Sequence, residues 1–208
     1  MSNAFRSVLF TPHVRAMQTR MGSREMYAAQ DEEQESPKEP RGPLLSPREA
    51  RFIEAQDGFY QATVNETGWP YVQFRGGPTG FLKVLDANTV GYADFRGNVQ
   101  YISVGNLQAD DRVSIILMDY ANQRRLKLIG RARLVDISKD EALRNRLQLP
   151  GYRAKVERAV VISLEGFDWN CPQHITPRYT EAEIEEATQP LRARIAELEA
   201  QLAAQPSA

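Results

Sequence analysis

The sequence is short of cysteine and of long apolar runs. Cys171 is the single cysteine among the 208 residues, which excludes an intramolecular disulfide and a cysteine-rich metal site. This usage fits a reducing compartment, so we expect a cytoplasmic protein. No window approaches the roughly 18 consecutive apolar residues of a membrane-spanning helix. The N-terminal run from Val8 to Phe10 is too short for the apolar part of a secretory signal, and we expect no membrane insertion.

An excess of charge of either sign is also missing. The 26 Lys and Arg residues nearly balance the 27 Asp and Glu residues, with a formal net charge of −1, so nothing attracts the whole protein to nucleic acid or to an anionic membrane. The basic pattern RRLKLIGRAR at residues 124–133 keeps a nucleic-acid-binding barrel as an alternative, which the neutral balance disfavours. Catalytic-triad order, paired-histidine motifs and phosphate-loop motifs do not occur, so the sequence supports neither a hydrolase nor a metal site.

Composition divides the chain into three segments. Residues 1–45 are interpreted as an N-terminal arm with one short helix and a linker, because residues 30–43 (QDEEQESPKEPRGP) have no large apolar residue and contain three prolines. Residues 46–179 carry the strand patterns and form the principal domain. Residues 180–208 are expected to form a C-terminal helix, which Thr180 and Glu183 begin as a capping box.

The principal domain opens with a helix signal and continues with strands. Ser46, Pro47 and Glu49 combine a capping box with proline at the first helical position. Apolar or alternating runs follow, mostly joined by hairpin turns: FYQATV, PYVQF, GFLKVLD, NTVGYADF, RVSIILMDY, RRLKLIGRARLVDI and AVVISLEGFDW. We expect a meander in which RVSIILMDY, residues 112–120, is buried on both faces. The expected fold class is mainly β, a closed or nearly closed antiparallel β-barrel with flanking helices, since closure removes exposed edges.

Two later helices are predicted. Residues 138–150, SKDEALRNRLQLP, have Ser138 as the N-cap of a short helix. Apolar residues of the C-terminal helix fall on one stripe with 4-3-4 spacing: Leu191, Ile195, Leu198 and Leu202. We expect this stripe to pack on its own subunit, with a coiled segment that stabilises a dimer or binds a partner as the alternative.

Arginines gather where strands meet turns. Arg75 precedes Gly76 and Gly77, Arg96 lies in DFRGN, and Arg124 begins a strand. Guanidinium groups pair with phosphate, and glycines let backbone N–H groups approach it, so this distribution favours an anion site. Solvated barrel rims are the alternative.

Two polar segments are candidate ligand sites. Residues 94–106, DFRGNVQYISVGN, join amide side chains to aromatic rings, a composition suited to a planar heteroaromatic ligand. A polar loop that caps the core is the alternative. Residues 167–180, FDWNCPQHITPRYT, collect many chemically capable side chains in one loop, for each of which an ordinary packing role is the alternative.

Together these stretches resemble the FMN-binding split-barrel family, which includes the pyridoxamine 5′-phosphate oxidases. The similarity covers residues 45–180, and four stretches carry it: FRGGPTGFLKVLD, YADFRGNVQYISVGNLQADDRVSIILMD, RRLKLIGRARLVD and FDWNCPQHITPRYT. The resemblance implies a homodimer with two FMN sites at the subunit interface, where basic side chains of neighbouring strands hold the phosphate.

The resemblance also implies a set of cofactor-binding residues: Arg75, Gly76, Gly77, Lys83, Asp94, Phe95, Arg96, Gly97, Asn98, Asn106, Arg124, Trp169 and Arg178. Within this set, Arg75, Lys83 and Arg96 would address the phosphate. Asn98 and Asn106 would address the flavin ring. The last two members, Trp169 and Arg178, resemble the pair that reaches the flavin from the partner subunit.

The expected function is that of a flavin-dependent oxidoreductase acting on a small organic molecule. The C-terminal arginine-leucine-histidine motif of the oxidase proper does not occur, which speaks against pyridoxamine phosphate oxidation itself, and no catalytic residue is assigned. The alternative is a non-catalytic protein that binds or senses flavin or another cofactor, such as haem or a deazaflavin. Replacing both Arg75 and Lys83 by alanine is expected to abolish flavin retention.

Overall fold

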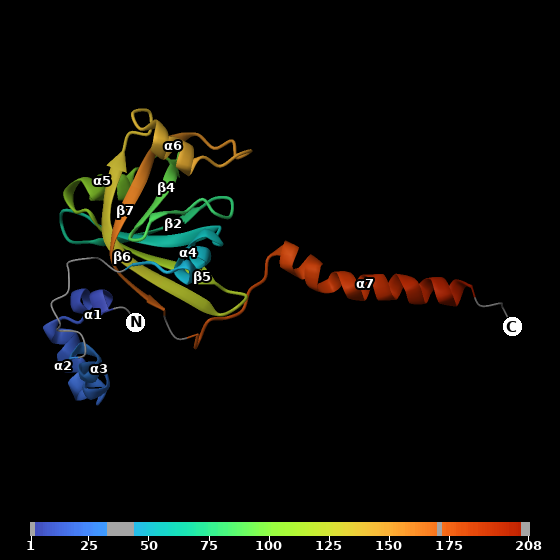
Figure 1. Ribbon diagram of the computed structural model, residues 1–208, viewed down its shortest axis with the longest axis horizontal. Coiled ribbons are helices and arrows are strands. Elements are labelled where there is room, and N and C mark those ends of the chain that lie inside the picture. The colour runs from blue at the N-terminus through green and yellow to red at the C-terminus, as the bar shows by residue number, and fades with distance from the viewer. Residues whose placement is uncertain (1–2, 33–43, 170–171, 205–208) are drawn as a thin grey trace.

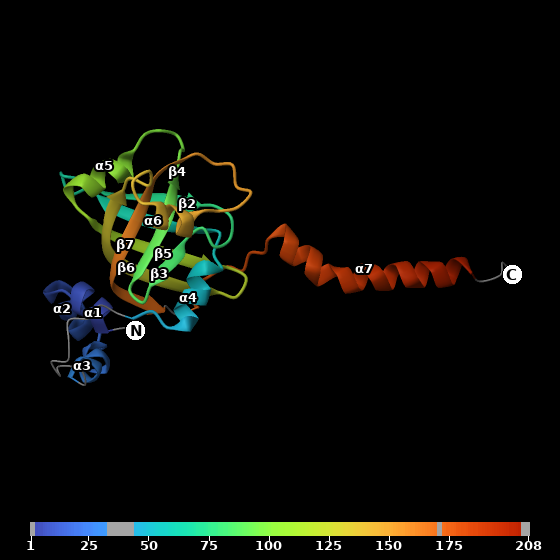
Figure 2. The same cartoon turned by 45° about the horizontal axis from the view of Figure 1, so that its top comes forward.

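One curled sheet of seven antiparallel strands forms the body of the computed structural model, which describes residues 3–32, 44–169 and 172–204 (Figure 1, Figure 2). The strands are β1 (Gly58–Val64), β2 (Pro70–Gly76), β3 (Lys83–Asp86), β4 (Thr89–Phe95), β5 (Arg112–Asp119), β6 (Arg124–Val135) and β7 (Val156–Trp169). Their order across the sheet is β2-β1-β5-β6-β7-β4-β3. The mainly β class with flanking helices is confirmed. The sheet is not closed, because β2 and β3 at its two ends do not pair with each other.

The sheet curls so far that its two halves meet through side chains. Tyr92 of β4 donates a hydrogen bond to Gln61 of β1 (2.9 Å), and Arg75 of β2 donates one to Asp94 of β4 (2.6 Å). Neither strand pair is adjacent in the sheet. The architecture is therefore a barrel split along one side, with β2 and β4 facing each other across the split.

The predicted meander is wrong at two connections. β2 does not pair with β3, because the two strands lie at opposite ends of the sheet. β4 pairs with β7 instead of β5, because α5 (Ile102–Ala109) carries the chain across to β5, which pairs with β1 and β6. The prediction that residues 112–120 are buried on both faces is also wrong. Buried and more accessible positions alternate along β5, so only one face of this strand borders the core.

The apolar core fills the inside of the curl. Phe59 and Phe81 stack there with ring centroids 5.5 Å apart. Fully buried aliphatic residues include Ile53, Leu82, Ile115, Leu117, Leu126, Leu128 and Ile162. α4 (Pro47–Glu54) contributes to this core from outside the sheet, and its predicted capping box between Ser46 and Glu49 is confirmed.

The short helix α6 (Glu141–Leu147) begins later than predicted. Asp140, not Ser138, is its N-cap, because the Asp140 carboxylate accepts a hydrogen bond from the backbone N–H of Leu143 (2.9 Å). The Ser138 hydroxyl donates instead to Asp136 (2.6 Å) in the preceding turn. Both residues favour caps and turns, so the sequence alone does not decide between them.

The first helix of the N-terminal arm packs on the sheet. Instead of the single helix predicted, the described residues of the arm form three: α1 (Asn3–Leu9), α2 (Pro12–Arg20) and α3 (Arg24–Glu32). α1 lies against β7, where a Cβ at Gly166 would come within 2.6 Å of the Phe5 Cα. The missing side chain of Gly166 therefore makes room for this helix. The predicted linker, residues 30–43, falls mostly outside the described residues.

Gly166→Ala is expected to lower the free energy of unfolding by about 1–3 kcal/mol, because the backbone of Phe5 must move to accept the methyl group. Urea unfolding followed by circular dichroism measures the loss. Gly105→Ala in α5 is the matched control, since nothing lies within 4 Å of its Cβ position, and alanine favours helix over glycine. Equal losses in the two variants would contradict a specific α1 contact.

The C-terminal helix α7 (Glu181–Ala203) extends away from the barrel (Figure 1, Figure 2). Its predicted capping box between Thr180 and Glu183 is confirmed. No residue of α7 is buried, so the prediction that its apolar stripe packs on the same subunit is wrong.

Candidate functional site

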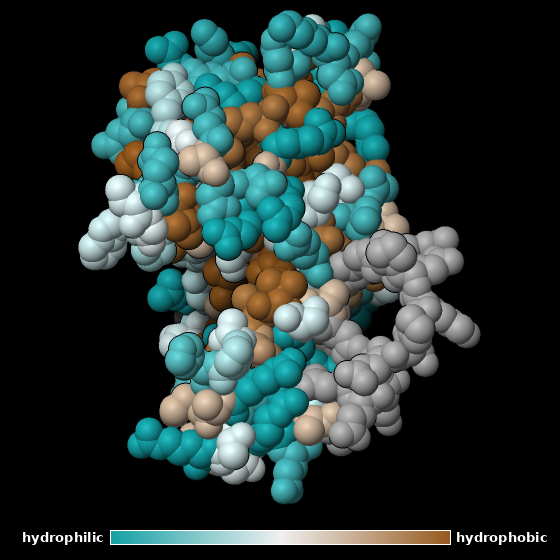
Figure 3. All heavy atoms as spheres, turned by 90° about the vertical axis from the view of Figure 1, so that its left-hand side faces the viewer, coloured by the Kyte–Doolittle hydropathy of each residue, from teal (hydrophilic) through white to brown (hydrophobic). Residues whose placement is uncertain are grey.

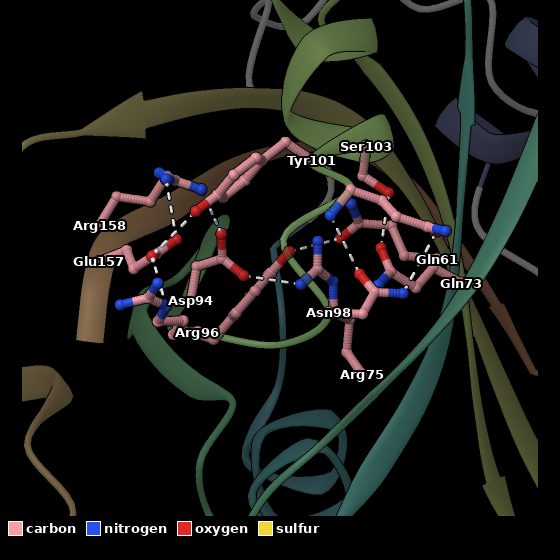
Figure 4. Close-up of polar contacts among 12 residues, drawn as sticks. Gln61, Gln73, Arg75, Asp94, Arg96, Asn98, Tyr101, Ser103, Glu157 and Arg158 are labelled. Atoms are coloured by element: carbon pink, nitrogen blue, oxygen red, sulfur yellow. Dashed lines mark hydrogen bonds and ion pairs between the residues drawn. The ribbon is translucent and has the colours of Figure 1, made fainter. Parts of the chain in front are cut away.

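A polar cleft opens where the barrel is split. The cleft consists of two adjoining hollows. Both are lined by Gln73 and Arg75 of β2 and by Asp94 and Phe95 at the end of β4. The larger hollow has a volume of about 240 Å³. The loop after β4, the start of α5 and the start of β7 complete the wall. We call this region the arginine cleft and define it by its polar side chains (Figure 4): Gln73, Arg75, Asp94, Arg96, Asn98, Tyr101, Ser103, Glu157 and Arg158.

Strand periodicity brings these side chains to the inner face of the barrel. Along β2, Gln73 and Arg75 are half-buried whereas Phe74 between them is exposed, because successive side chains point to opposite faces. Along β4, Asp94 lies two residues after the buried Tyr92 and therefore on the same inner face. Asp94 meets Arg75 there across the split.

Two arginines hold the carboxylate of Asp94. Its oxygens accept hydrogen bonds from Arg75 (2.6 Å) and Arg158 (2.9 Å), and its side chain is only 5% exposed. Glu157 accepts another bond from Arg158 (3.1 Å) and lies 3.9 Å from Nε of Arg96. Three guanidinium groups thus face two carboxylates, which leaves one positive charge in excess in the cleft.

Two buried donors near the split have no partner among the described residues, Nε of Arg75 and Nε2 of Gln61. Burial raises the pKa of Tyr92 well above its usual value, so its hydroxyl stays protonated and donates to Oε1 of Gln61. This bond engages only the Gln61 oxygen, and the amide nitrogen has no acceptor among the described residues. A buried donor without an acceptor costs about 1–3 kcal/mol, and an acceptor from outside the chain would remove this cost.

The loop between β4 and α5 is strained. Val99 and Tyr101 have positive φ angles of 57° and 53°. Such angles are unfavourable for every residue except glycine, and most unfavourable for β-branched residues such as valine. Tyr101 occupies the N-cap position of α5 without a side-chain cap, so the first N–H groups of the helix lack that acceptor. Helix N-termini attract anions, and strained loops cluster at ligand sites.

The sequence comparison identifies the family. Residues 45–161, more than half of the chain, match the model of the pyridoxamine 5′-phosphate oxidase family. The chain belongs to this family. The membership predicted from the sequence resemblance is therefore confirmed, and the protein is a split-barrel member of a flavoprotein family. No curated protein matches the sequence.

Solved structures similar to this family member come from several bacteria. A putative pyridoxamine 5′-phosphate oxidase from Lactobacillus delbrueckii has 17% identity and a TM-score of 0.47, and the match covers 63% of this chain and 98% of that one. HupZ from Group A Streptococcus has 14% identity and a TM-score of 0.46, with coverage of 65% and 100%. A conserved hypothetical protein from Mycobacterium tuberculosis has 19% identity and a TM-score of 0.46, with coverage of 69% and 96%. Likeness at this level says nothing of the ligand.

More than half of the cofactor-binding residues expected from the family resemblance line the arginine cleft: Arg75, Gly76, Asp94, Phe95, Arg96, Gly97 and Asn98. They come from β2, from β4 and from the loop after β4. The structure brings them together, and their contact with a cofactor stays a prediction.

Three expected residues lie elsewhere in the barrel. Gly77 packs against the Phe81 side chain, which a Cβ would approach to 2.9 Å. Lys83 begins β3 and does not line the cleft. Asn106 is buried in α5, where its amide donates a hydrogen bond to Thr63 (3.0 Å) and ties this helix to β1.

Arg124 and Arg178 share a second hollow of about 550 Å³, between the β5–β6 turn and the start of α7. Arg124 pairs with Asp119 (2.6 Å), and Arg178 lies 5.0 Å from the centre of the Tyr120 ring. Burial acts to raise the pKa of Asp119, but hydrogen bonds, chiefly from Arg124, outweigh it and lower the pKa. This hollow shares no lining residue with the arginine cleft, so the two do not form one site within a single chain.

Trp169 has a packing role in the single chain. Its indole N–H donates to Glu49 (2.6 Å), and its ring meets Phe52 edge-on with centroids 4.7 Å apart. The guanidinium of Arg48 lies 4.5 Å from the centre of the indole ring. Trp169 thus fastens the end of β7 to α4, and its expected contact with a flavin stays a prediction.

Glu49→Gln is expected to lower the free energy of unfolding by about 1–2 kcal/mol at pH 7, because Glu49 holds both the helix cap and Trp169. Burial acts to raise the Glu49 pKa, but hydrogen bonds from Ser46 and Trp169 outweigh it and lower the pKa below 4.5. A lowered folded-state pKa stabilises the fold above the unfolded pKa, and this contribution is lost as the pH falls through the folded pKa. Urea unfolding from pH 7 to 3 should therefore show the two proteins converging in acid, whereas a constant difference would contradict the role of the charge.

Three residues of the cleft were missed by the sequence analysis: Gln73, Glu157 and Arg158. Gln73 carried a signal, because it is the polar residue of an otherwise apolar strand pattern. Glu157 and Arg158 carried none, because they reach the cleft only through the pairing of β7 with β4, which the expected meander did not contain.

Neither a metal-binding cluster nor a membrane-spanning helix occurs in the described ranges. No group of three or more His, Cys, Asp or Glu residues in that part of the chain is placed to hold a metal ion. The helices described there are too short or too polar to cross a bilayer.

Proposed function

We propose that the arginine cleft binds FMN and that the protein is a flavin-dependent oxidoreductase acting on a small organic molecule. The observation that carries this proposal is the surplus guanidinium charge beside the uncapped start of α5. Both features suit a phosphate group. Bound FMN would supply the hydride-accepting chemistry, and the chain would supply binding, orientation and hydrogen bonds.

Arg96 is the side chain best suited to meet the phosphate. It is 54% exposed and 3.9 Å from Glu157, so it can turn toward an anion without leaving a deeply buried carboxylate unpaired. Arg75 has a different part, because its guanidinium holds Asp94 in place. The unpartnered Nε donor of Arg75, which lines the cleft, fits a ligand rich in acceptor atoms, such as a flavin.

We also propose a homodimer with the cofactor at the subunit interface. Exposed apolar side chains lie on the outer face of β1 and β2: Tyr60 (38% exposed), Val72 (60%) and Phe74 (57%). Trp69, in the turn between the two strands, is 73% exposed. The inner face of β2 lines the cleft. A second copy bound to the outer face would therefore be separated from the ligand only by β2 itself. Figure 3, which views the molecule from the side away from α7, shows apolar patches on the barrel surface. In this dimer, Arg124, Trp169 and Arg178 would approach the flavin from the partner subunit.

The segment boundaries and location belong to the same proposal. Residues 1–45 form the arm and linker, residues 46–179 the FMN-binding domain and residues 180–208 the C-terminal helix, in a cytoplasmic protein. The family match over residues 45–161 supports the start of the domain.

The visible absorption spectrum of the purified protein tests the proposal. We expect a flavin spectrum, and chromatography of the chromophore released on denaturation should identify it as FMN in stoichiometric amount. A colourless protein that also gives no heat in a calorimetric titration with FMN would overturn the proposal.

One feature of the cleft favours a second candidate, a flavin-binding protein without turnover. Both carboxylates, Asp94 and Glu157, are engaged with arginines, so neither is free to act as a general base. Anaerobic reduction of the bound flavin separates the candidates. An enzyme exchanges electrons with a physiological donor or acceptor faster than free FMN does, and a carrier or sensor does not.

A further inference from the structure

The stripe of α7 that contains Leu191, Ile195, Leu198 and Leu202 continues toward the start of the helix. Six residues follow alternating four- and three-residue spacing: Ile184, Thr188, Leu191, Ile195, Leu198 and Leu202. Residues with this spacing lie along one side of a helix, as the a and d positions of a coiled coil do. The five aliphatic members are 41–66% exposed, and an exposed apolar stripe of this extent marks an interaction surface.

We propose that α7 pairs with α7 of a second copy of this chain as a parallel, in-register, two-stranded coiled coil. The spacing puts Ile195 at an a position between Leu191 and Leu198 at d positions. Isoleucine at a with leucine at d favours two parallel strands. The polar Thr188 also falls at an a position, where a polar residue sets the register at some loss of stability.

The charges beside the stripe favour the parallel orientation. In a parallel pair, each g residue faces the e residue five positions later in the other helix, which places Arg194 opposite Glu199 of the partner subunit on both sides of the coil. In an antiparallel pair with the same apolar layers matched, e residues face e residues and g residues face g residues. Arg192 would then lie opposite Arg192 of the partner subunit, and Arg194 opposite Arg194 of the partner subunit. Like charges at such short range repel.

Tethering to the barrel is part of this proposal. Pro190 lies inside α7 but off the stripe, and proline removes one helical hydrogen bond and bends a helix. The uninterrupted part, residues 191–203, has about the 12–15 residues at which isolated helices are marginal. The pairing therefore rests on the proposed homodimer, which holds the two helices at high effective concentration.

Disulfide crosslinking of the full chain tests the pairing. In a Cys171→Ser background, Leu198→Cys puts the only thiol in the stripe, where the Cα atoms of an in-register parallel pair are close enough to bridge. Mild oxidation should then crosslink the chains at least about tenfold faster than in the matched variant Ala196→Cys, which lies off the stripe. Equal rates would overturn the proposal and would be the result if α7 folds back on its own barrel or binds an unrelated protein. Crosslinks that form only when Leu191→Cys and Ile195→Cys chains are mixed would indicate an antiparallel pair and would overturn it as well.

A charge exchange gives a second measurement. Arg194→Glu should slow crosslinking of the Leu198→Cys protein several-fold, because two attractive pairs become repulsive, and Glu199→Arg in the same chain should restore the rate. A double variant as slow as the single one would contradict the parallel register. The flavin content of each variant is measured alongside. Crosslinking without bound FMN would support the coiled coil and contradict the proposed function. Bound FMN without crosslinking would support the proposed function and contradict the coiled coil.

Discussion

Arg96→Ala is expected to weaken FMN binding about tenfold to a hundredfold, the loss that follows when hydrogen bonds between a guanidinium and a phosphate are removed. Arg96 is 54% exposed, so the fold should remain intact and the effect should appear in binding alone. Calorimetric titration of the flavin-free protein measures the dissociation constant. Thermal unfolding of the same sample checks that stability is unchanged.

Arg131→Ala is the matched control for Arg96→Ala. Arg131 is 52% exposed and pairs with Asp111 (2.7 Å) and Glu165 (2.6 Å), outside the arginine cleft. Its removal lowers the net charge by the same amount and should leave the dissociation constant within about twofold, because surface pairs contribute little. If both variants bound FMN as tightly as the parent, the arginines of the cleft would be a solvated rim and the phosphate would bind elsewhere.

Arg75→Ala would give a different pattern from Arg96→Ala. Removing Arg75 leaves the buried carboxylate of Asp94 with Arg158 as its ionic partner among the described residues, so stability should fall together with FMN affinity. Arg75 and Lys83 are best replaced singly, because only Arg75 lines the cleft. The double replacement of Arg75 and Lys83 is expected to abolish flavin retention. If Arg75→Ala alone releases the flavin, this effect belongs to the arginine cleft and not to Lys83.

The local features of the fold were predictable because short-range chemistry determines them. Ser46 with Glu49 and Thr180 with Glu183 each place a cap and its partner three residues apart, and the strands of the sheet follow runs visible in the sequence. α5 was not predicted, because glycine and asparagine lie within it and Tyr101 begins it in a left-handed conformation. Such a conformation is imposed by the surrounding structure and not by local preference.

The arginine cleft was only half predictable for a related reason. Arg75 and Arg96 stood out as arginines beside turns, whereas their setting depends on long-range pairing. Arg158 reaches Asp94 from 64 positions later in the chain, which requires the pairing of β4 with β7. The free position of α7 could not be predicted either, since an apolar stripe looks the same whether it packs on its own subunit or on another chain.

Phe74→Asp is expected to convert the proposed homodimer into monomers and to release FMN with it. Phe74 is 57% exposed in the single chain, and its ring contacts that of Tyr60 in a tilted arrangement with centroids 5.3 Å apart. A buried charge at this position of a dimer would raise the dissociation constant by at least about a hundredfold. Analytical ultracentrifugation over a range of protein concentrations measures the dimer. Absorbance at the flavin band in the same experiment reports which species carries the cofactor.

Met26→Asp separates an effect of the interface from an effect of exposed apolar surface in general. Met26 of α3 is 58% exposed, almost the same as Phe74, and lies on the N-terminal arm. Its replacement should leave both the dimer and the flavin unchanged. If Phe74→Asp remained dimeric, the outer face of β1 and β2 would not be the interface. If it became monomeric yet held FMN with the affinity of the parent, the cleft of one chain would suffice for the cofactor. Arg124 and Arg178 in the second hollow would then need a role that does not involve the flavin.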